Sequence, residues 1–427
     1  MKIVVVGAGA IGLASAYALA ETGADVHVVD PRGVGGGASR RNAGWVVPMM
    51  SGPVPAPGVV SKSLRWMLRR DSPLYVRPSF DPQFIRFMLT MLRACNERDY
   101  ERGLQQLCTL NAQTEALYQA WERAGMDLQR ERRGILMLFK DESNLQAHAL
   151  ELHTAVEHGL GSHQVLTLRE ARSEVHGLSA DVVGAIDCSS DSYLDPGRLM
   201  DELARACVDR GVAIHSGDRI DGLEAAPGRR VRSATGSVRH QADYFVVAAG
   251  VWTPELMKTV GVRVAVQAGK GYGFDVPDPS PSSKRPDRAL YLSEARVAIT
   301  PMPGRTRLAG TMAFGGLDES VDARRASGIL KSAGQYLSGW PDNKNLEPWS
   351  GLRPMTPDGL PLIGRVPEFD NLLVATGHAM AGITLAPVTG SIIARIVSTG
   401  TTPAEALPFD PARFVTAVGY RSTTSEN

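Results

Sequence analysis

Residues 3–12, Ile-Val-Val-Val-Gly-Ala-Gly-Ala-Ile-Gly, join an apolar run of strand length to three spaced glycines. The pattern predicts a buried strand with a tight turn at Gly7, close approach of the backbone to a ligand at Gly9, and close helix–strand packing at Gly12. The sequence therefore predicts a dinucleotide-binding unit. The alternative is an ordinary strand–helix turn whose glycines serve packing alone.

A helix and a second strand continue this unit. The helix would begin with free N–H groups in its first turn, which includes Ala10 and Ile11, and the positive end of its dipole favours a diphosphate. Residues 26–29 predict the second strand, and Asp30 stands at its tip, about 20 residues after the glycines. A carboxylate there accepts hydrogen bonds from ribose hydroxyls and disfavours a 2′-phosphate.

The composition describes a globular chain without a strongly charged partner. Its 427 residues, 43% hydrophobic and 21% charged, suffice for two or three domains. Lys plus Arg number 46 against 45 for Asp plus Glu, so no basic surplus favours nucleic acid. The four cysteines are far apart without a Cys-x-x-Cys pair, and the chain starts in a strand instead of a signal peptide. We expect a cytoplasmic protein without a transmembrane helix.

The histidines do not suggest a metal site. His148, His153, His158 and His163 repeat every five residues. Residues that share one face of a helix recur every three or four positions, so this spacing scatters the imidazoles around a helix. The sequence implies no metal.

The rest of the chain alternates between segments of different kinds. Residues 33–44 are rich in glycine and polar residues and predict a ligand loop. Apolar residues recur at helical spacing over 61–124, and residues 134–139 predict a strand. Asp195 is a good N-cap for a helix that begins at Pro196. Segments typical of the nucleotide unit are interrupted by others, which indicates discontinuous domains.

Short motifs in a fixed order give a resemblance to a known family. They are residues 7–12 (GAGAIG), Ser39 with 42–44 (NAG), 193–200 (YLDPGRLM), 242–253 (ADYFVVAAGVWT), 270–272 (KGY), 351–354 (GLRP) and 376–378 (TGH). The chain resembles the FAD-dependent amine and D-amino acid oxidoreductases, the DAO family, and within it most of all the bacterial D-amino acid dehydrogenases. It departs from the typical dehydrogenase at Arg40-Arg41 and at Ala268-Gly269 before Lys270.

The resemblance implies an α/β fold with two discontinuous domains. Residues 1–50, 190–255 and 346–427 would form a Rossmann-like FAD-binding domain of the glutathione-reductase type. Residues 51–189 and 256–345 would form an α+β substrate domain built on an antiparallel sheet.

The resemblance also implies FAD as the cofactor and assigns a set of residues to it. They are Gly7, Gly9, Ala10, Ile11, Gly12, Asp30, Ser39, Arg40, Asn42, Ala43, Gly44, Ala249, Gly250, Trp252, Gly377, Gly382, Ile383 and Thr384. The small tip at Ala249 and Gly250 would let the backbone approach the flavin nucleotide. Residues 377–384 would present amides and a helix dipole to flavin N1 and the C2 carbonyl, where negative charge gathers on reduction. For Arg40 the alternative is a solvated loop.

The absence of a cysteine from one segment bears on whether the flavin is covalently attached. Residues 353–364 contain no cysteine, whereas the covalent sarcosine oxidases of this superfamily attach their flavin in that stretch. We therefore expect noncovalent FAD.

Four residues are candidates for the substrate site. Arg353 resembles the family arginine whose guanidinium holds the substrate carboxylate in a bidentate pair, and the alternative is an ion pair with Asp358. Tyr272 either gives a hydroxyl to the same carboxylate or amine, or packs its ring in a strand. Lys270 either lies near flavin N5 or bonds a backbone carbonyl. His378 either contacts the flavin or is a structurally bonded histidine.

The implied reaction is oxidative deamination of a D-amino acid. A hydride would pass from the α-carbon to flavin N5, and the imine would hydrolyse to a 2-oxo acid and ammonia. The electrons would pass to a quinone or another acceptor. The alternatives are an oxygen-using oxidase of glycine or a secondary amine such as sarcosine or proline, and a flavin subunit of a larger amine dehydrogenase.

One segment bears on the electron acceptor. Residues 61–70, Ser-Lys-Ser-Leu-Arg-Trp-Met-Leu-Arg-Arg, mix basic and bulky apolar side chains, as a helix lying on an anionic bilayer would. The hypothesis is peripheral contact with the cytoplasmic face of the inner membrane. The alternative is a surface helix of the substrate domain with its charges in water.

Overall fold

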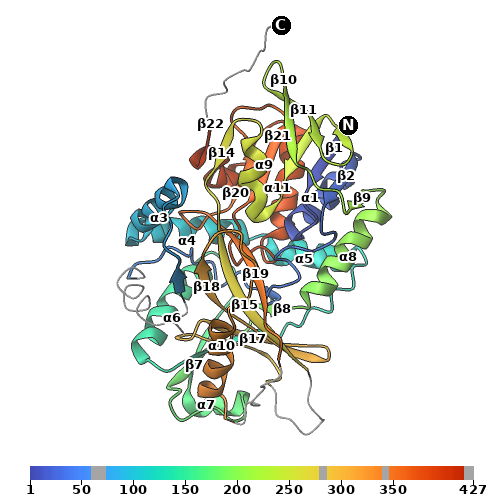
Figure 1. The fold of residues 1–427 in the computed structure, drawn as a ribbon. Coiled ribbons are helices and arrows are strands. Elements are labelled where there is room, and N and C mark those ends of the chain that lie inside the picture. The colour runs from blue at the N-terminus through green and yellow to red at the C-terminus, as the bar shows by residue number, and fades with distance from the viewer. Residues whose placement is uncertain (59–73, 278–285, 339–345, 418–427) are drawn as a thin grey trace.

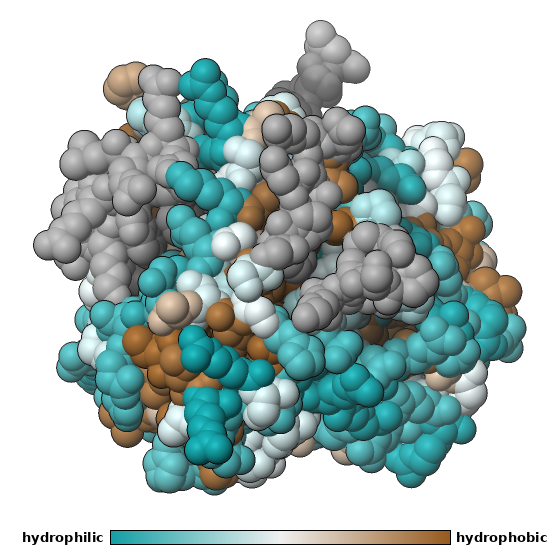
Figure 2. Space-filling model, turned by 90° about the horizontal axis from the view of Figure 1, so that it is seen from below, coloured by the Kyte–Doolittle hydropathy of each residue, from teal (hydrophilic) through white to brown (hydrophobic). Residues whose placement is uncertain are grey.

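The computed structural model describes residues 1–58, 74–277, 286–338 and 346–417. The predicted helix over residues 61–70 lies outside the described residues. The described chain is built on a six-stranded sheet in the upper half of the molecule and a nine-stranded sheet in the lower half (Figure 1). Viewed from below, the surface is largely hydrophilic with smaller apolar areas between the polar ones (Figure 2).

The six-stranded sheet carries the glycine-rich turn at its centre. Its strands, in spatial order, are β20 (Leu362–Arg365), β21 (Leu372–Thr376), β13 (Tyr244–Val247), β1 (Lys2–Val6), β2 (Asp25–Asp30) and β9 (Ala213–Ser216). Neighbouring strands run parallel except β20 and β21. Ile3 and Val5 belong to the core cluster on the face that carries the helices, whereas Val4 and Val6 belong to the cluster on the other face. The strand is apolar throughout because both of its faces are covered.

Three helices cover one face of this sheet. They are α1 (Ala10–Glu21), α8 (Pro196–Asp209) and α11 (Ala386–Thr399), and α1 packs against both of the others. The Asp195 carboxylate caps α8 as predicted, accepting a hydrogen bond from the amide of Gly197 at 2.8 Å.

The nine-stranded sheet is mostly antiparallel. Its strands are β19 (Trp349–Met355), β15 (Gln267–Pro277), β18 (Arg305–Phe314), β17 (Val297–Met302), β16 (Ala289–Leu292), β5 (Ile135–Phe139), β7 (Gly184–Cys188) and β6 (Gln164–Thr167), with β4 (Leu74–Val76) beside β18. One face packs on α10 (Ala323–Tyr336) through a continuous apolar cluster. The opposite face receives the polar loop that follows β2. The predicted pairing of a parallel nucleotide sheet with a second, antiparallel sheet is confirmed.

The remaining elements connect and flank the two sheets. The helices are α3 (Pro82–Ala94), α4 (Glu97–Asn111), α5 (Thr114–Arg123), α6 (Glu142–Glu157), α7 (Leu168–Glu174) and α9 (Thr253–Lys258), with 3-10 turns η1 (Gly250–Trp252), η2 (Ala404–Phe409) and η3 (Pro411–Arg413). The short strands are β3 (Trp45–Val46), β8 (Ser192–Tyr193), β10 (Gly222–Ala226), β11 (Arg230–Thr235), β12 (Arg239–Gln241), β14 (Val262–Val264) and β22 (Val415–Ala417).

Some helices and strands pack across the predicted domain boundaries. Residues 256–266 contribute Met257 and Val262 to the core of the nucleotide half, although the predicted boundary falls at 255. The β19 strand joins the lower sheet, although residues from 346 onward are predicted to be nucleotide domain. Leu110 on α4 and Tyr118 on α5 are buried in the cluster around α1 and α11. Chain order alone does not show which core a helix or strand joins.

Candidate active site

The glycine-rich turn has the predicted geometry. Gly7 has a φ of 114°, which L side chains rarely adopt, and a Cβ on Gly12 would come within 1.8 Å of the Gly7 carbonyl oxygen. Both positions therefore need glycine for the turn itself. A Cβ on Gly9 would meet only the Ser39 hydroxyl, at 3.0 Å, so the space beside Gly9 is otherwise open.

The first turn of α1 offers backbone donors at this open space. The amides of Ile11 and Gly12 have no hydrogen-bond acceptor among the described residues. The Ala10 amide donates to Ser39 Oγ at 3.0 Å. Free amides at a helix N-terminus bind phosphate groups, because the helix dipole adds to their hydrogen bonds. The residues present therefore fit a diphosphate.

Asp30 is held at the tip of β2, next to this turn. Its carboxylate accepts hydrogen bonds from the amides of Ala8 at 2.8 Å and Arg32 at 2.7 Å. The Arg32 guanidinium lies 4.4 Å from the ring centroid of Trp252 and pairs with Glu319 at 2.8 Å. Arg32 and Glu319 were not predicted from the sequence, and they join the nucleotide half to the loop after β18.

The tip that follows β13 lies beside the glycine-rich turn. A Cβ on Gly7 would come within 2.4 Å of the Ala248 carbonyl oxygen, so the two segments meet through bare backbone. Ala249 precedes the η1 turn, and Gly250 has a φ of 55°. The Gly250 carbonyl accepts a hydrogen bond from Thr376 Oγ1 at 3.0 Å, which ties this tip to the end of β21.

The loop at residues 38–44 crosses from the nucleotide half to the lower sheet. Arg307 on β18 donates to the carbonyl of Asn42 at 2.9 Å, and Thr300 on β17 donates to the carbonyl of Ala43 at 2.9 Å. Gly44 has a φ of 82°, and its amide donates to the Asn42 side chain at 2.8 Å. The predicted loop is thus fixed at both ends.

Arg40 uses its side chain elsewhere. Its guanidinium donates to the carbonyls of Val34 at 3.0 Å and Gly197 at 3.2 Å and pairs with Asp201 on α8. Each of the three guanidinium nitrogens has a protein acceptor, which favours a structural role for this side chain over the predicted contact with the cofactor. Arg41 is exposed and donates to the Ser350 carbonyl at 2.9 Å.

A second set of free backbone donors precedes α11. The amides of Gly382, Ile383 and Thr384 have no acceptor among the described residues, and we call these three residues the amide cradle. The Thr384 hydroxyl donates to the carbonyl of Trp45 and accepts from the amide of Val47, each at 3.2 Å. Its side chain is therefore structural, and the cradle acts through its backbone.

Gly377 and His378 precede the amide cradle in the chain, and their contacts fix the backbone there. Gly377 has a φ of 80°, and a Cβ there would come 2.5 Å from Thr356 Cγ2. His378 is 3% exposed, and its Nε2 lies 2.9 Å from Thr389 Oγ1 on α11. Burial lowers the pKa of His378 to about 3, so the imidazole is neutral. These contacts favour the interpretation of a structurally bonded histidine.

Arg353 on β19 is a cation without a carboxylate partner among the described residues. It donates to the Thr311 carbonyl at 2.8 Å, and burial lowers its pKa to about 10, which leaves it charged at neutral pH. The alternative partner Asp358 pairs instead with Arg413 at 3.1 Å. A partly exposed arginine whose charge is desolvated and unpaired can bind a carboxylate.

Lys270 and Tyr272 do not contact Arg353, and their surroundings favour the structural alternatives given above, a backbone hydrogen bond for Lys270 and ring packing for Tyr272. Side chains along a strand alternate between faces, and Gly271, between these two residues, is the one that faces the Arg353 guanidinium. Lys270 donates instead to Asp318 at 3.1 Å and to the Ser320 carbonyl at 2.9 Å. Tyr272 is 2% exposed in the cluster under α10, as expected for a packed strand residue.

Sequence reasoning missed Thr311, which positions Arg353. Its φ of 65° is rare for a β-branched residue, and the pairing of β18 with β15 shifts register beside it. Its Oγ1 is buried and has no hydrogen-bond partner within the described part of the chain. Nothing in the local sequence marks this bulge, because it arises from the pairing of two strands.

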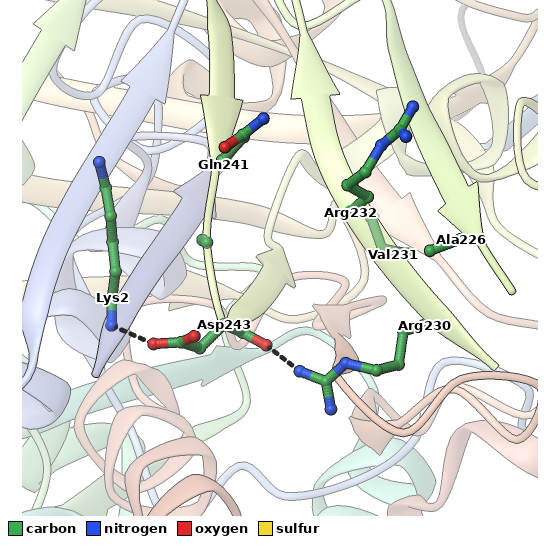
Figure 3. A pocket seen from close by; sticks show the side chains of 8 residues that line it. Lys2, Ala226, Arg230, Val231, Arg232, Gln241 and Asp243 are labelled. Carbon is green, nitrogen blue, oxygen red and sulfur yellow. Dashed lines mark hydrogen bonds between the residues drawn. The ribbon is translucent and has the colours of Figure 1, made fainter. Parts of the chain in front are cut away.

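A surface pocket of about 480 Å³ lies away from these groups. It is lined by residues that include Lys2, Arg230, Arg232 and Gln241, and Figure 3 shows them around Asp243. Lys2 begins β1, at the opposite end of the strand from the glycine-rich turn. The Asp243 carboxylate accepts a hydrogen bond from the Lys2 amide at 2.8 Å. This pocket is no part of the candidate site.

Comparison with known proteins gives the class of this protein. Residues 2–396 match the family described as FAD-dependent oxidoreductase (DAO), and the chain belongs to that family, as predicted. A D-amino acid dehydrogenase of Rhizorhabdus wittichii is 32% identical over 404 residues, which cover 93% of this chain and 96% of that protein. A D-amino acid dehydrogenase of Vibrio cholerae is 31% identical over 421 residues, covering 97% and 99%.

Solved structures agree on the fold. Glycine oxidase from Geobacillus kaustophilus superposes with a TM-score of 0.72 at 24% identity, covering 96% of this chain and 99% of that one. L-proline dehydrogenase from P. horikoshii superposes with a TM-score of 0.73 at 18% identity, covering 96% and 97%. The family establishes FAD as the cofactor, and the free amides at α1 and before α11 fit its diphosphate and its ring.

Proposed function

We propose that this chain catalyses the oxidative deamination of a D-amino acid and passes the electrons to a quinone or another acceptor. Bound FAD would supply the ring that accepts a hydride from the substrate α-carbon, and the imine would hydrolyse to a 2-oxo acid and ammonia. The relatives named as D-amino acid dehydrogenases support this substrate class.

The unpaired Arg353 carries the proposal. Its guanidinium would bind the substrate carboxylate in two parallel hydrogen bonds and so fix the orientation of the α-carbon. The sulfur of Met312 lies 4.0 Å from Nη1, and Met355 lies beside it in an apolar cluster. An apolar wall next to a bound carboxylate would exclude water and receive the substrate side chain.

Anaerobic reduction of the bound flavin tests the proposal. The purified holoenzyme is mixed with D-amino acids, their L-enantiomers, glycine, sarcosine and both prolines, and the loss of the flavin absorbance is followed. We expect D-amino acids to bleach the flavin fastest and a quinone analogue to restore the colour faster than air does. Fastest bleaching by glycine or sarcosine with rapid reoxidation in air would identify an oxidase. No bleaching by any substrate would favour a flavin subunit that needs its partner chains.

We further propose weak contact with the cytoplasmic face of the inner membrane, where a quinone acceptor would be found. Ile85, Leu89 and Leu92 are 43%, 51% and 46% exposed and share the outer face of α3. Arg86 and Arg93 are exposed beside them. Apolar side chains bordered by arginine suit an anionic bilayer, and each cation near it contributes about 1 kcal/mol. None of the described helices is long and apolar enough to cross a membrane.

Liposome flotation at low salt tests this contact. We expect the protein to float with vesicles that contain anionic lipid, and the variant Ile85→Gln/Leu89→Gln to float less. The control is Val208→Gln, because Val208 is 57% exposed on α8. Equal flotation of both variants, or none by the wild type, contradicts the contact at α3.

A further inference from the structure

Tyr118 reaches the amide cradle from a distant part of the chain. It lies on α5 with no exposed surface, and its hydroxyl donates to the carbonyl of Ile383 at 2.8 Å. The two residues are 265 positions apart in the sequence. Burial raises the pKa of Tyr118, so the phenol stays protonated and remains a donor.

The Tyr118 ring is held by its neighbours. The guanidinium of Arg130 lies 5.2 Å from the ring centroid, and Trp121 packs edge-on at 5.3 Å. Arg130 is itself fixed by ion pairs with Glu115 and with Glu122, the latter at 3.2 Å. A cation over the ring draws electron density from the phenol and strengthens the hydroxyl as a donor.

The hydrogen bond acts on one particular backbone donor. The Ile383 carbonyl and the Thr384 amide belong to the same peptide group. A donor on a peptide carbonyl polarises the whole group and strengthens its N–H. The Thr384 amide has no acceptor among the described residues, and its side chain is anchored to Trp45 and Val47. The donor is therefore both strengthened and immobile.

We propose that Tyr118 is a positioning residue that raises the reduction potential of bound FAD through the amide cradle. This inference rests on the proposed function, because it takes the cradle to face the pyrimidine end of the flavin ring. Reduction places negative charge there, so a stronger and fixed donor favours the reduced form over the oxidised form. Tyr118 touches neither the substrate nor the reacting atoms in this scheme.

Measurement of the flavin potential in Tyr118→Phe tests the proposal. The variant keeps the ring and loses the hydroxyl. Cooperative polarisation adds about 10–30% to one charge-assisted hydrogen bond, so we expect the binding of reduced relative to oxidised flavin to weaken about 1.3-fold to fourfold. At 29.6 mV per tenfold for a two-electron couple, the potential falls by about 3–18 mV. The potential is read by equilibration with a reference dye in the holoenzyme.

Tyr336→Phe is the matched control. Tyr336 is 2% exposed, and its hydroxyl donates to Glu294 at 2.5 Å in the cluster under α10. The Tyr336→Phe variant also loses one tyrosine hydroxyl hydrogen bond, but away from the cradle, so its urea midpoint should fall while its flavin potential stays unchanged. A Tyr118→Phe potential equal to that of the wild type overturns the proposal and makes Tyr118 a purely structural residue.

If Tyr118→Phe does not fold, a second substitution at the same position tests the proposal by strengthening the hydrogen bond. Replacing Tyr118 by 3-fluorotyrosine keeps the hydroxyl and makes it a stronger donor, so the potential should rise. An unchanged or lower potential contradicts the proposal. The proposed function has a separate test. If it is wrong, D-amino acids do not bleach the wild-type flavin, but the flavin potential can still be measured because dye equilibration needs no substrate.

Discussion

The Arg353 guanidinium occupies the space that a side chain at position 271 would need. A Cβ on Gly271 would lie 2.3 Å from Nη1 and 2.4 Å from Nη2 of Arg353. Gly271 on β15 pairs with Gly351 on β19, and the guanidinium of Arg353, two residues further along β19, extends over Gly271. Glycine at 271 is therefore needed for the arginine to lie flat on the sheet, which links a backbone position to the candidate carboxylate site.

Gly271→Ala should weaken substrate binding without unfolding the protein. The methyl group displaces the end of a flexible side chain and not the backbone, so the sheet can keep its structure. A displacement of about 1 Å at a binding group costs up to about a hundredfold, and we expect kcat/KM to fall about tenfold to a hundredfold. The control is Gly334→Ala on α10, where a Cβ would meet no described residue within 4 Å. Unchanged kinetics in Gly271→Ala would show that Arg353 does not act in this position.

Arg353→Lys and Arg353→Ala should lose activity in increasing order. Lysine keeps the charge without the forked geometry, and alanine loses both. The alanine variant leaves a substrate carboxylate without its partner, so we expect kcat/KM to fall about a hundredfold or more. Flavin content should not change. An amine without a carboxylate should be turned over equally by all three proteins, and an equal loss on both substrates would make Arg353 structural.

Gly9→Val should give a folded protein that binds no flavin. Among the described residues, a Cβ at position 9 meets only the Ser39 hydroxyl, and the valine side chain would extend into the space in front of the free amides of α1. We expect a circular dichroism spectrum like that of the wild type and no flavin absorbance. A yellow Gly9→Val protein would place the diphosphate elsewhere.

Acid should release the flavin from the wild type. The cysteines are poor attachment sites, since burial raises the pKa of Cys108 to about 11 and that of Cys207 to about 12. After precipitation with trichloroacetic acid, the yellow colour should remain in the supernatant. Colour in the pellet would indicate a covalent bond.

His378 should make stability depend on pH between neutrality and pH 5. Its pKa falls from 6.5 in the unfolded chain to about 3 in the folded one, so only the unfolded chain binds the proton in this range. The free energy of unfolding therefore falls as the pH falls below about 6.5, by about 2 kcal/mol at pH 5. His378→Gln should show a shallower dependence of the urea midpoint on pH, at saturating FAD. Parallel profiles would show that His378 does not titrate in this way.

The sequence by itself determined the glycine-rich turn and the family. Gly7 and Gly12 fix a turn through local backbone geometry, Gly9 leaves open space beside it, and Asp30 follows at a set distance along the chain. Such features depend on residues close in sequence, so they can be recognised in the sequence without knowledge of the fold. The ordered motifs then gave the family, and through it the cofactor.

Only the tertiary structure decided which side chains meet. The register of β15 with β18 and β19 separates Lys270 and Tyr272 from Arg353, and a bulge at Thr311 supplies the carbonyl that holds the guanidinium. Tyr118 reaches Ile383 across 265 residues. Strand register and helix docking are set by packing between distant segments, and a shift of one residue turns a side chain to the opposite face. The spacing of residues along the chain therefore does not predict which side chains meet.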